Sequence, residues 1–189
     1  MEEFFVDNNL YVGAEGDKSG EGSIKREVYA LLEALEIPFM RADHAVADTI
    51  AECADIERVL GAPICKNLFL CNRQKTEFYL LLMPGDKPFR TADVSKLIGK
   101  ARLSFASADA MGQYLGLTPG SVSVLGLMND REKRVTLLID REVAEGEYIG
   151  CHPCLNTSTL KIKTRDIFEK FLARTGHTAT ILDIPRAEI

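Results

Sequence analysis

Residues 67–83 carry the pattern that decides the fold: the apolar run NLFLC, the polar run NRQKT and the apolar run EFYLLLM. The two apolar runs, Asn67–Cys71 and Glu77–Met83, have the length of β-strands, and the five polar residues between them suit a turn. Pro84-Gly85-Asp86 then adds residues that favour turns. The stretch therefore predicts a β-hairpin.

Further helices and strands are expected on both sides of the hairpin. Ser23, Thr49, Thr91, Ser107 and Thr164 are the residues expected to cap helices. The apolar spacing predicts helices over 24–35, 50–60, 91–98, 108–115 and 165–175, and strands over 39–46, 121–125, 134–139, 148–151, 158–162 and 178–184. Because these elements do not alternate regularly, we expect an α+β fold: a single domain whose mixed, largely antiparallel central sheet is flanked by helices.

The length and composition fit one globular domain. The chain has 189 residues, of which 46% are hydrophobic and 27% charged, and this length is sufficient for a sizeable core. We expect residues 1–22 to be an N-terminal extension and residues 23–189 to be the domain. The acidic residues Glu2, Glu3 and Asp7 argue against a signal peptide, and no apolar run has membrane-spanning length. The expected location is the cytoplasm, without a membrane partner.

The net charge of −5 limits the partners of the chain. Proteins that coat DNA or RNA gain affinity by neutralising many phosphates, so a broad nucleic-acid surface, and DNA as a partner, are not expected. The end of a nucleic acid remains possible as a ligand. Local basic clusters occur at residues 96–102 and 161–165, although each also fits an ordinary solvated face.

Five cysteines, Cys53, Cys65, Cys71, Cys151 and Cys154, suggest metal or redox chemistry at first sight. Structural zinc sites combine two close ligand pairs, and the spacing of Cys65 and Cys71 is too wide for such a pair. The pair Cys151 and Cys154 is not followed by a predicted helix that would activate a thiol. We therefore expect reduced thiols, with no metal and no cofactor.

Familiar catalytic motifs are absent from the sequence. The stretch Gly120-Ser121-Val122-Ser123 does not form the Gly-x-Ser-x-Gly motif of many hydrolases, and no glycine-rich phosphate loop is present. Cys151 and His152 are neighbours on a predicted strand, so their side chains should point to opposite faces and could not readily act as nucleophile and base.

Two polar clusters at predicted strand ends are the candidate site. One is Gly150 to Thr159, which contains His152 and Asn156, and the other begins with Lys66 and Asn67. Lys66 could bind a phosphate, His152 could exchange a hydrogen bond near neutral pH, and Gly150 permits a close backbone approach. Each residue alone also fits a structural role, such as a solvated lysine or a turn former. Together they suggest one shared pocket.

Four motifs in order resemble the YbaK/prolyl-tRNA synthetase-associated editing domain family, and in particular its freestanding ProX-type members. They are residues 62–70 (APICKNLFL) with 79–85 (YLLLMPG), residues 117–127 (LTPGSVSVLGL), residues 152–160 (HPCLNTSTL) with the helix 166–172, and residues 43–49 (DHAVADT). The resemblance covers about residues 23–184. Val124 stands where relatives often have proline.

The resemblance implies a trans-editing deacylase that hydrolyses mischarged proline tRNA, most often alanine esterified to it. Lys66 and His152 would be the catalytic residues. The substrate-binding residues would be Asn67, Gly120, Ser121, Gly150, Cys151 and Asn156. The partner would be the acceptor end of aminoacylated proline tRNA, with prolyl-tRNA synthetase as a further possible partner.

The family mechanism uses a hydroxyl of the tRNA's terminal ribose and a held water, which agrees with the absence of a catalytic triad. An aminoacyl ester is already activated, so positioning and charge stabilisation can suffice. Two alternatives stay open at this point. The substrate could be cysteine on proline tRNA, or the domain could be a non-catalytic module that binds a small amino acid or a tRNA end.

Overall fold

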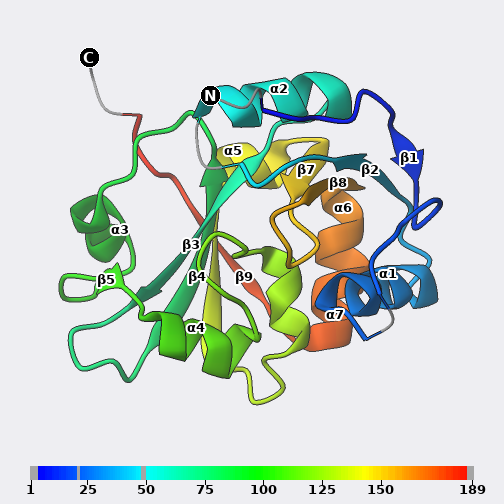
Figure 1. Cartoon of the computed structure of the whole chain (residues 1–189). Helices are drawn as coiled ribbons and strands as arrows, with labels where there is room; N and C mark the ends of the chain where they lie inside the picture. The colour runs from blue at the N-terminus through cyan, green and yellow to red at the C-terminus, as the bar shows by residue number, and fades with distance from the viewer. Residues whose placement is uncertain (1–3, 21, 48–49, 187–189) are drawn as a thin grey trace.

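The computed structural model describes residues 4–20, 22–47 and 50–186 and contains two β-sheets (Figure 1). The four-stranded sheet has the order β1 (Tyr11–Val12), β2 (Phe39–Asp43), β8 (Ser158–Lys163), β7 (Tyr148–Cys151). The five-stranded sheet has the order β5 (Ser104–Phe105), β3 (Cys65–Cys71), β4 (Phe78–Pro84), β6 (Val135–Asp140), β9 (Ala179–Leu182).

Five of the seven pairings between the described strands are antiparallel, which confirms the α+β prediction. All pairs of the four-stranded sheet are antiparallel, as are the pairs that β3 forms with β4 and β5. Only β4–β6 and β6–β9 are parallel among the described strands. The predicted central sheet is thus divided in two, and a parallel bridge between Ile64 and Gly150 links the two sheets.

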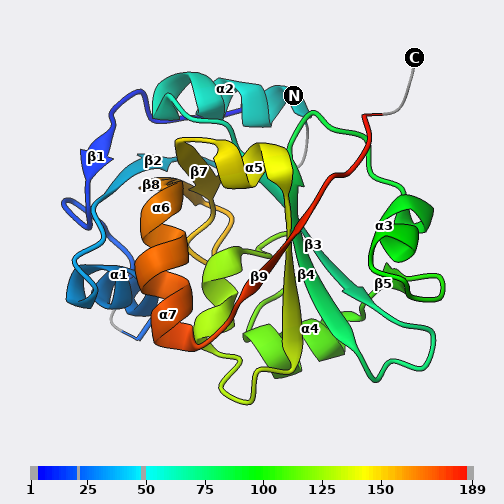
Figure 2. The ribbon, with the colours of Figure 1, turned by 180° about the vertical axis from the view of Figure 1, so that it is seen from behind.

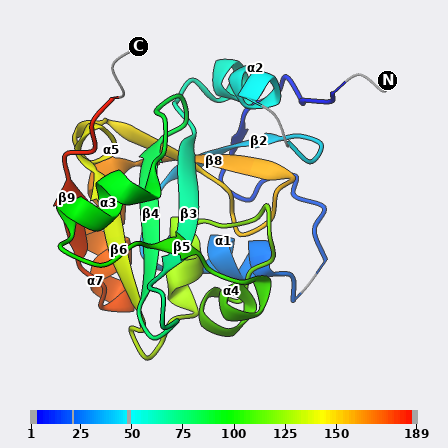
Figure 3. The same cartoon turned by 90° about the vertical axis from the view of Figure 1, so that its left-hand side faces the viewer.

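The helices are α1 (Ile24–Ala34), α2 (Ile50–Leu60), α3 (Thr91–Leu97), α4 (Ala108–Leu115), the 3-10 helix η1 (Val124–Met128), α5 (Arg141–Glu145), α6 (Thr164–Asp166), the π-helical turn η2 (Ile167–Phe171) and α7 (Leu172–Thr175). Figure 2 shows the helix that runs from α6 to α7 beside β9. In Figure 3, α3 lies in front of the five-stranded sheet, whereas α1 and α7 lie behind it.

The hairpin that the sequence predicts is buried on both faces. Leu80 and Leu82 of β4 point into the main core. Leu81 and Met83 point the other way, into a second cluster that includes Val94 of α3. Because successive side chains of a strand alternate between its faces, two covered faces require an uninterrupted apolar run. This explains the sequence YLLLM.

Several predicted boundaries hold and others do not. Ser23 and Ser107 cap α1 and α4 as expected, each accepting a hydrogen bond from a backbone N–H of the first turn. Thr91 and Thr164 are instead the first residues of their helices, and the preceding Arg90 and Lys163 occupy the capping position without a side-chain bond. The capping box expected at Thr49 lies outside the described residues.

The predicted strand over 121–125 is wrong. The turn at Thr118 closes through a hydrogen bond from Ser121 N to Thr118 O of 3.0 Å. The hydroxyl of Ser123 then accepts from Leu125 N at 3.2 Å and starts η1. Side-chain bonds to nearby backbone compete with strand formation, and here they prevail. Three short elements, β1, β5 and α5, are not predicted by the sequence pattern.

Candidate active site

The chain segments that carry the two polar clusters approach each other where the sheets join. Gly150 N donates to Pro63 O at 2.9 Å, next to the bridge between Gly150 and Ile64. A Cβ atom at residue 150 would lie 2.5 Å from Pro63 O, which real contacts do not allow. The close approach predicted for Gly150 therefore exists, but the protein's own backbone makes it. A glycine is needed here to bring β3 and β7 together.

Asn67 ties the start of β3 to the loop over residues 118–123. Its Oδ1 accepts from Val124 N at 3.0 Å, and its Nδ2 donates to Cys65 O at 3.0 Å. Within the loop, Ser121 is buried, and its hydroxyl donates to Thr118 O at 2.8 Å. Both polar groups of the Asn67 side chain are thus engaged by the protein, so Asn67 shapes the loop.

Asn156 lies near Gly120 of this loop and bonds to the backbone of Ala47. Its Nδ2 donates to Ala47 O at 3.1 Å, and its Oδ1 accepts from Ala47 N at 3.5 Å. A Cβ atom placed on Gly120 would lie 3.8 Å from Asn156 Nδ2. Gly120 has φ of +88°, a conformation that favours glycine. The loop over 118–121 therefore lies near Asn156 in the turn between β7 and β8, and Asn156 in turn bonds to the segment before α2.

His152 is neutral and has a defined tautomer. Its Nδ1 lies 2.9 Å from Ser158 O and 3.3 Å from Thr159 Oγ1. Because a carbonyl only accepts hydrogen bonds, Nδ1 carries the hydrogen, and Nε2 keeps its lone pair. Partial burial lowers the pKa of His152 to about 4, since the half-buried imidazole loses part of the hydration of its charged form. At neutral pH the ring therefore offers an acceptor.

His44 is the site residue that sequence reasoning did not select. Its ring centroid lies 5.8 Å from that of His152. Its Nε2 is 2.9 Å from Thr159 Oγ1, and its Nδ1 is 2.6 Å from Ala45 O. His44 appeared in the sequence only as a residue of an expected strand and of one family motif. That strand, β2, ends at Asp43, and His44 follows it in a bridge with Val6.

Cys151 and Cys154 lie in the main core and are buried. Burial raises the pKa of the Cys151 thiol to about 12 and raises that of Cys154 as well. A protonated, buried thiol is a poor nucleophile. Cys151 packs into the core, whereas the neighbouring His152 contacts Ser158 and Thr159. This supports the expectation that the pair cannot act as nucleophile and base.

Lys66 lies apart from the residues around His152. Its Nζ donates to Lys87 O at 2.7 Å. Successive side chains on β3 point to opposite faces, so Lys66 and Asn67 diverge, and Lys66 shares its face with Leu68 and Leu70. Before Lys66, Ile64 forms the bridge with Gly150, and after it Leu70 and Cys71 pair with β5. Residues 66–68, between these two pairings, are half-buried.

Two surface grooves lie away from His152. One of about 570 Å³ is lined by Arg73, Thr91, Arg102, Leu103, Ser104 and Phe105. Another of about 530 Å³ adjoins α6 and includes Lys163, Arg165 and Glu169. Neither groove includes any predicted site residue, and size alone is a weak guide to chemistry. The polar group of His152 with His44, Ser158 and Thr159 is the stronger candidate because it includes a residue with a perturbed pKa.

Comparison with known proteins identifies the family of this fold and site. Residues 44–170 match the aminoacyl-tRNA editing domain. The chain belongs to this family. It is 31% identical over 160 residues to the prolyl-tRNA editing protein ProX of Acetoanaerobium sticklandii, covering 85% of this chain and 97% of that protein. It is 30% identical over 161 residues to the prolyl-tRNA synthetase associated domain-containing protein 1 of Danio rerio, covering 84% and 86% respectively.

A solved structure shares the fold. The crystal structure of a candidate trans-editing enzyme for prolyl tRNA synthetase superposes with a TM-score of 0.64 at 17% identity. The superposition covers 87% of this chain and 99% of the other. The resemblance drawn from the sequence motifs is confirmed by the family match. This chain is accordingly an aminoacyl-tRNA deacylase, a hydrolase of the ester between amino acid and tRNA. It is called the editing enzyme below.

Within the described part of the chain, no group of three or more His, Cys, Asp or Glu side chains is arranged to hold a metal ion. None of the helices described here has both the length and the apolar character needed to span a bilayer.

Proposed function

We propose that the editing enzyme hydrolyses proline tRNA that carries the wrong amino acid, with alanine as the first candidate. The names of the two relatives support proline tRNA as the tRNA that is edited. The observation that carries the chemistry is His152, a neutral imidazole beside His44 and Thr159 whose Nε2 lone pair is left to accept a hydrogen bond.

In this mechanism His152 orients the attacking water. A base with a pKa of about 4 is too weak to remove a proton fully near neutral pH. The water oxygen attacks the ester carbon, and the bond from that carbon to the ribose oxygen breaks. The water proton passes to this oxygen through the neighbouring ribose hydroxyl. Lys66 holds the terminal phosphate, and the loop over Gly120 and Ser121 closes over the amino acid, supported by Asn67 and Asn156.

Size selection is the physical basis for preferring alanine. A loop packed against Asn156 excludes bulky side chains by steric clash. Distinguishing alanine from serine or cysteine is harder, because one small group contributes only about 1–3 kcal/mol. Cysteine on proline tRNA is therefore the second candidate, and the deacylation rates of the differently charged tRNAs decide between them.

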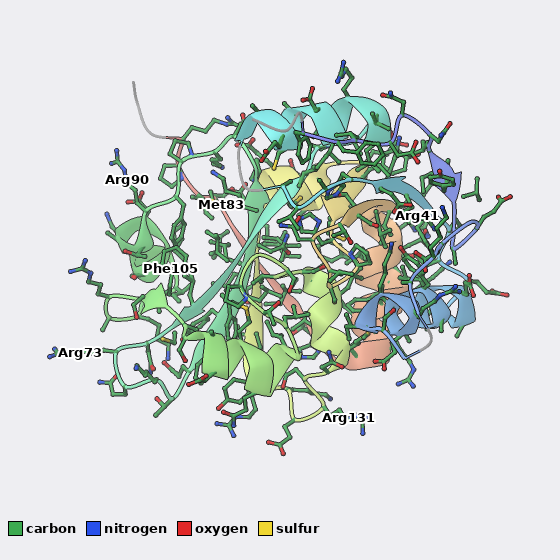
Figure 4. All side chains as sticks on the ribbon, in the orientation of Figure 1. Arg41, Arg73, Met83, Arg90, Phe105 and Arg131 are labelled. Atoms are coloured by element: carbon green, nitrogen blue, oxygen red, sulfur yellow. The ribbon has the colours of Figure 1, made fainter. Side chains whose placement is uncertain are left out.

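A basic surface around β5 and α3 is available to bind the tRNA end. Arg73, Arg90 and Phe105 lie on one side of the molecule, around β5 and α3 (Figure 4), and Phe105 is 61% exposed. Arg102 lines the groove between them. About 13 Å of strand separates Lys66 from Leu70, the residue paired with Phe105. Arginines can neutralise phosphates, and an exposed aromatic ring can stack on a base.

The second basic cluster is less available to phosphates. Lys161 donates to Gly61 O at 2.9 Å and lies over the Tyr148 ring. Arg165 pairs with Glu169 at 2.8 Å. Within the cluster next to α3, Lys100 pairs with Glu77, whereas Arg102 is exposed in its groove. We therefore favour the α3 side for the acceptor end, and prolyl-tRNA synthetase as a partner that could deliver the tRNA.

The test is a deacylation panel with purified enzyme and proline tRNA charged with alanine, cysteine, serine or proline. The proposal expects rapid release of alanine and little release of proline, relative to buffer. Release of cysteine alone would select the second candidate. Tight binding of tRNA without hydrolysis of any ester would instead favour a non-catalytic binding module.

A further inference from the structure

We propose that His44 is a positioning residue that, through the hydroxyl of Thr159, keeps the hydrogen of His152 on Nδ1. This inference rests on the role proposed for His152 in hydrolysis. It adds a second histidine to the site, one that acts on His152 through Thr159 and does not contact the substrate. The direction of the single hydrogen of the Thr159 hydroxyl decides which nitrogen of His152 is protonated.

The contacts of His44 determine the direction of that hydrogen. His44 Nδ1 lies 2.6 Å from the carbonyl oxygen of Ala45, so Nδ1 is the donor. His44 Nε2 is then an acceptor, and Thr159 Oγ1 lies 2.9 Å from it. The hydroxyl hydrogen of Thr159 is therefore directed at His44. A hydroxyl has one hydrogen, so the side of Oγ1 that faces His152 presents a lone pair.

His152 Nδ1–H consequently meets two acceptors. Ser158 O lies at 2.9 Å and Thr159 Oγ1 at 3.3 Å. If His44 offered no acceptor, the Thr159 hydroxyl would be free to turn and donate to His152 Nδ1. The hydrogen of the ring would then move to Nε2, and the site would lose the acceptor that orients water. Ser158 O favours the tautomer with hydrogen on Nδ1. By accepting the Thr159 hydrogen, His44 prevents that hydroxyl from donating to Nδ1 and favouring the other tautomer.

The N-terminal segment holds His44 in this position. Ala45 N donates to Phe5 O at 2.9 Å, and Val6 pairs with His44 in an antiparallel bridge. The ring of Phe4 lies 6.4 Å from that of His44, and His44 itself is buried, at 5% exposure. The family match begins at residue 44. Residues 4–6 therefore support the site from outside the matched domain.

The test measures the tautomer directly, by ¹⁵N NMR of the imidazole nitrogens in the full-length enzyme without substrate. The wild type should show His152 with hydrogen on Nδ1. His44→Phe, which keeps an aromatic ring but removes the acceptor, should move a large part of the hydrogen to Nε2. In deacylation of alanyl proline tRNA, kcat should fall by about tenfold or more because the attacking water loses the acceptor that orients it, with KM nearly unchanged.

A second substitution separates positioning from general structural support. His44→Phe combined with Thr159→Val removes the competing donor, so the Nδ1 tautomer and most of kcat should return. His44→Gln should also preserve the tautomer because its amide oxygen can accept from Thr159. His177→Phe is the matched control: it removes another buried histidine, one that pairs with Asp130, and should leave the His152 tautomer unchanged. If His44→Phe does not fold, His44→Met replaces it, since methionine adapts to irregular space.

The outcomes distinguish this inference from the proposed function. A wild-type His152 with hydrogen on Nε2, or a tautomer that His44→Phe does not change, would overturn the positioning role even if alanyl-tRNA is hydrolysed. Failure of the double variant to restore the tautomer would also contradict it. Correct tautomer shifts in an enzyme that hydrolyses no charged tRNA would leave the positioning role intact and refute the proposed function.

Discussion

His152 should make the folding stability depend on pH, and His152→Gln should remove that dependence. Burial lowers the pKa of His152 from 6.5 to about 4. The unfolded chain therefore binds a proton at a pH where the folded chain does not. Stability from this group is fully present above pH 6.5 and is lost as the pH falls towards 4. The complete shift corresponds to about 3 kcal/mol at 1.36 kcal/mol for each pKa unit.

Between pH 7 and pH 5 the linkage relation predicts a loss of about 2 kcal/mol for a histidine with these two pKa values. Urea unfolding at both pH values, for wild type and His152→Gln, measures this loss. Carboxylates and the other histidines titrate in both proteins, so the difference between the two isolates His152. The variant should lose about 2 kcal/mol less than the wild type. Equal losses would refute the burial argument and show that His152 is well hydrated.

Three further predictions concern other residues. Lys66→Ala should abolish most deacylation while the melting temperature stays close to that of the wild type, and near-normal rates would remove Lys66 from the site. Cys151→Ser and Cys154→Ser, if folded, should keep deacylation within about threefold because both thiols are buried and protonated; complete loss in either would revive thiol chemistry. Arg102→Glu should raise KM for tRNA and weaken its dependence on salt, whereas Arg131→Glu, the same charge change at an exposed arginine elsewhere (Figure 4), should not; equal effects would indicate a general charge effect.

Much of the fold could be predicted because it depends on local patterns. The hairpin of β3 and β4 follows from two apolar runs and a polar turn. Ser23 and Ser107 predict the starts of α1 and α4 because their side chains can cap a helix. The failure at residues 121–125 has a local cause as well. Ser121 and Ser123 bond to nearby backbone, and such bonds compete with a strand of the same composition.

The site was harder to predict because its contacts join distant parts of the chain. Gly150 was selected for close approach, but only the structure identifies Pro63 as the group that approaches. His44 lies 115 residues from Thr159, and no spacing rule connects them. Its importance depends on the direction of one hydroxyl hydrogen, which follows from three-dimensional contacts alone. Lys66 and Asn67 are neighbours in sequence, yet alternation along β3 sends them to different faces.

The most direct test of the proposed function is hydrolysis of a minimal substrate by the wild-type enzyme. The substrate is an acceptor-stem minihelix of proline tRNA charged with alanine, and the control is the same minihelix charged with proline. The account predicts that the alanyl ester is cleaved almost as fast as on full-length tRNA, while the prolyl ester is spared. If the alanyl minihelix decays no faster than in buffer although the full alanyl-tRNA is cleaved, recognition confined to the acceptor end is wrong. If neither alanyl substrate is cleaved, alanine editing is contradicted.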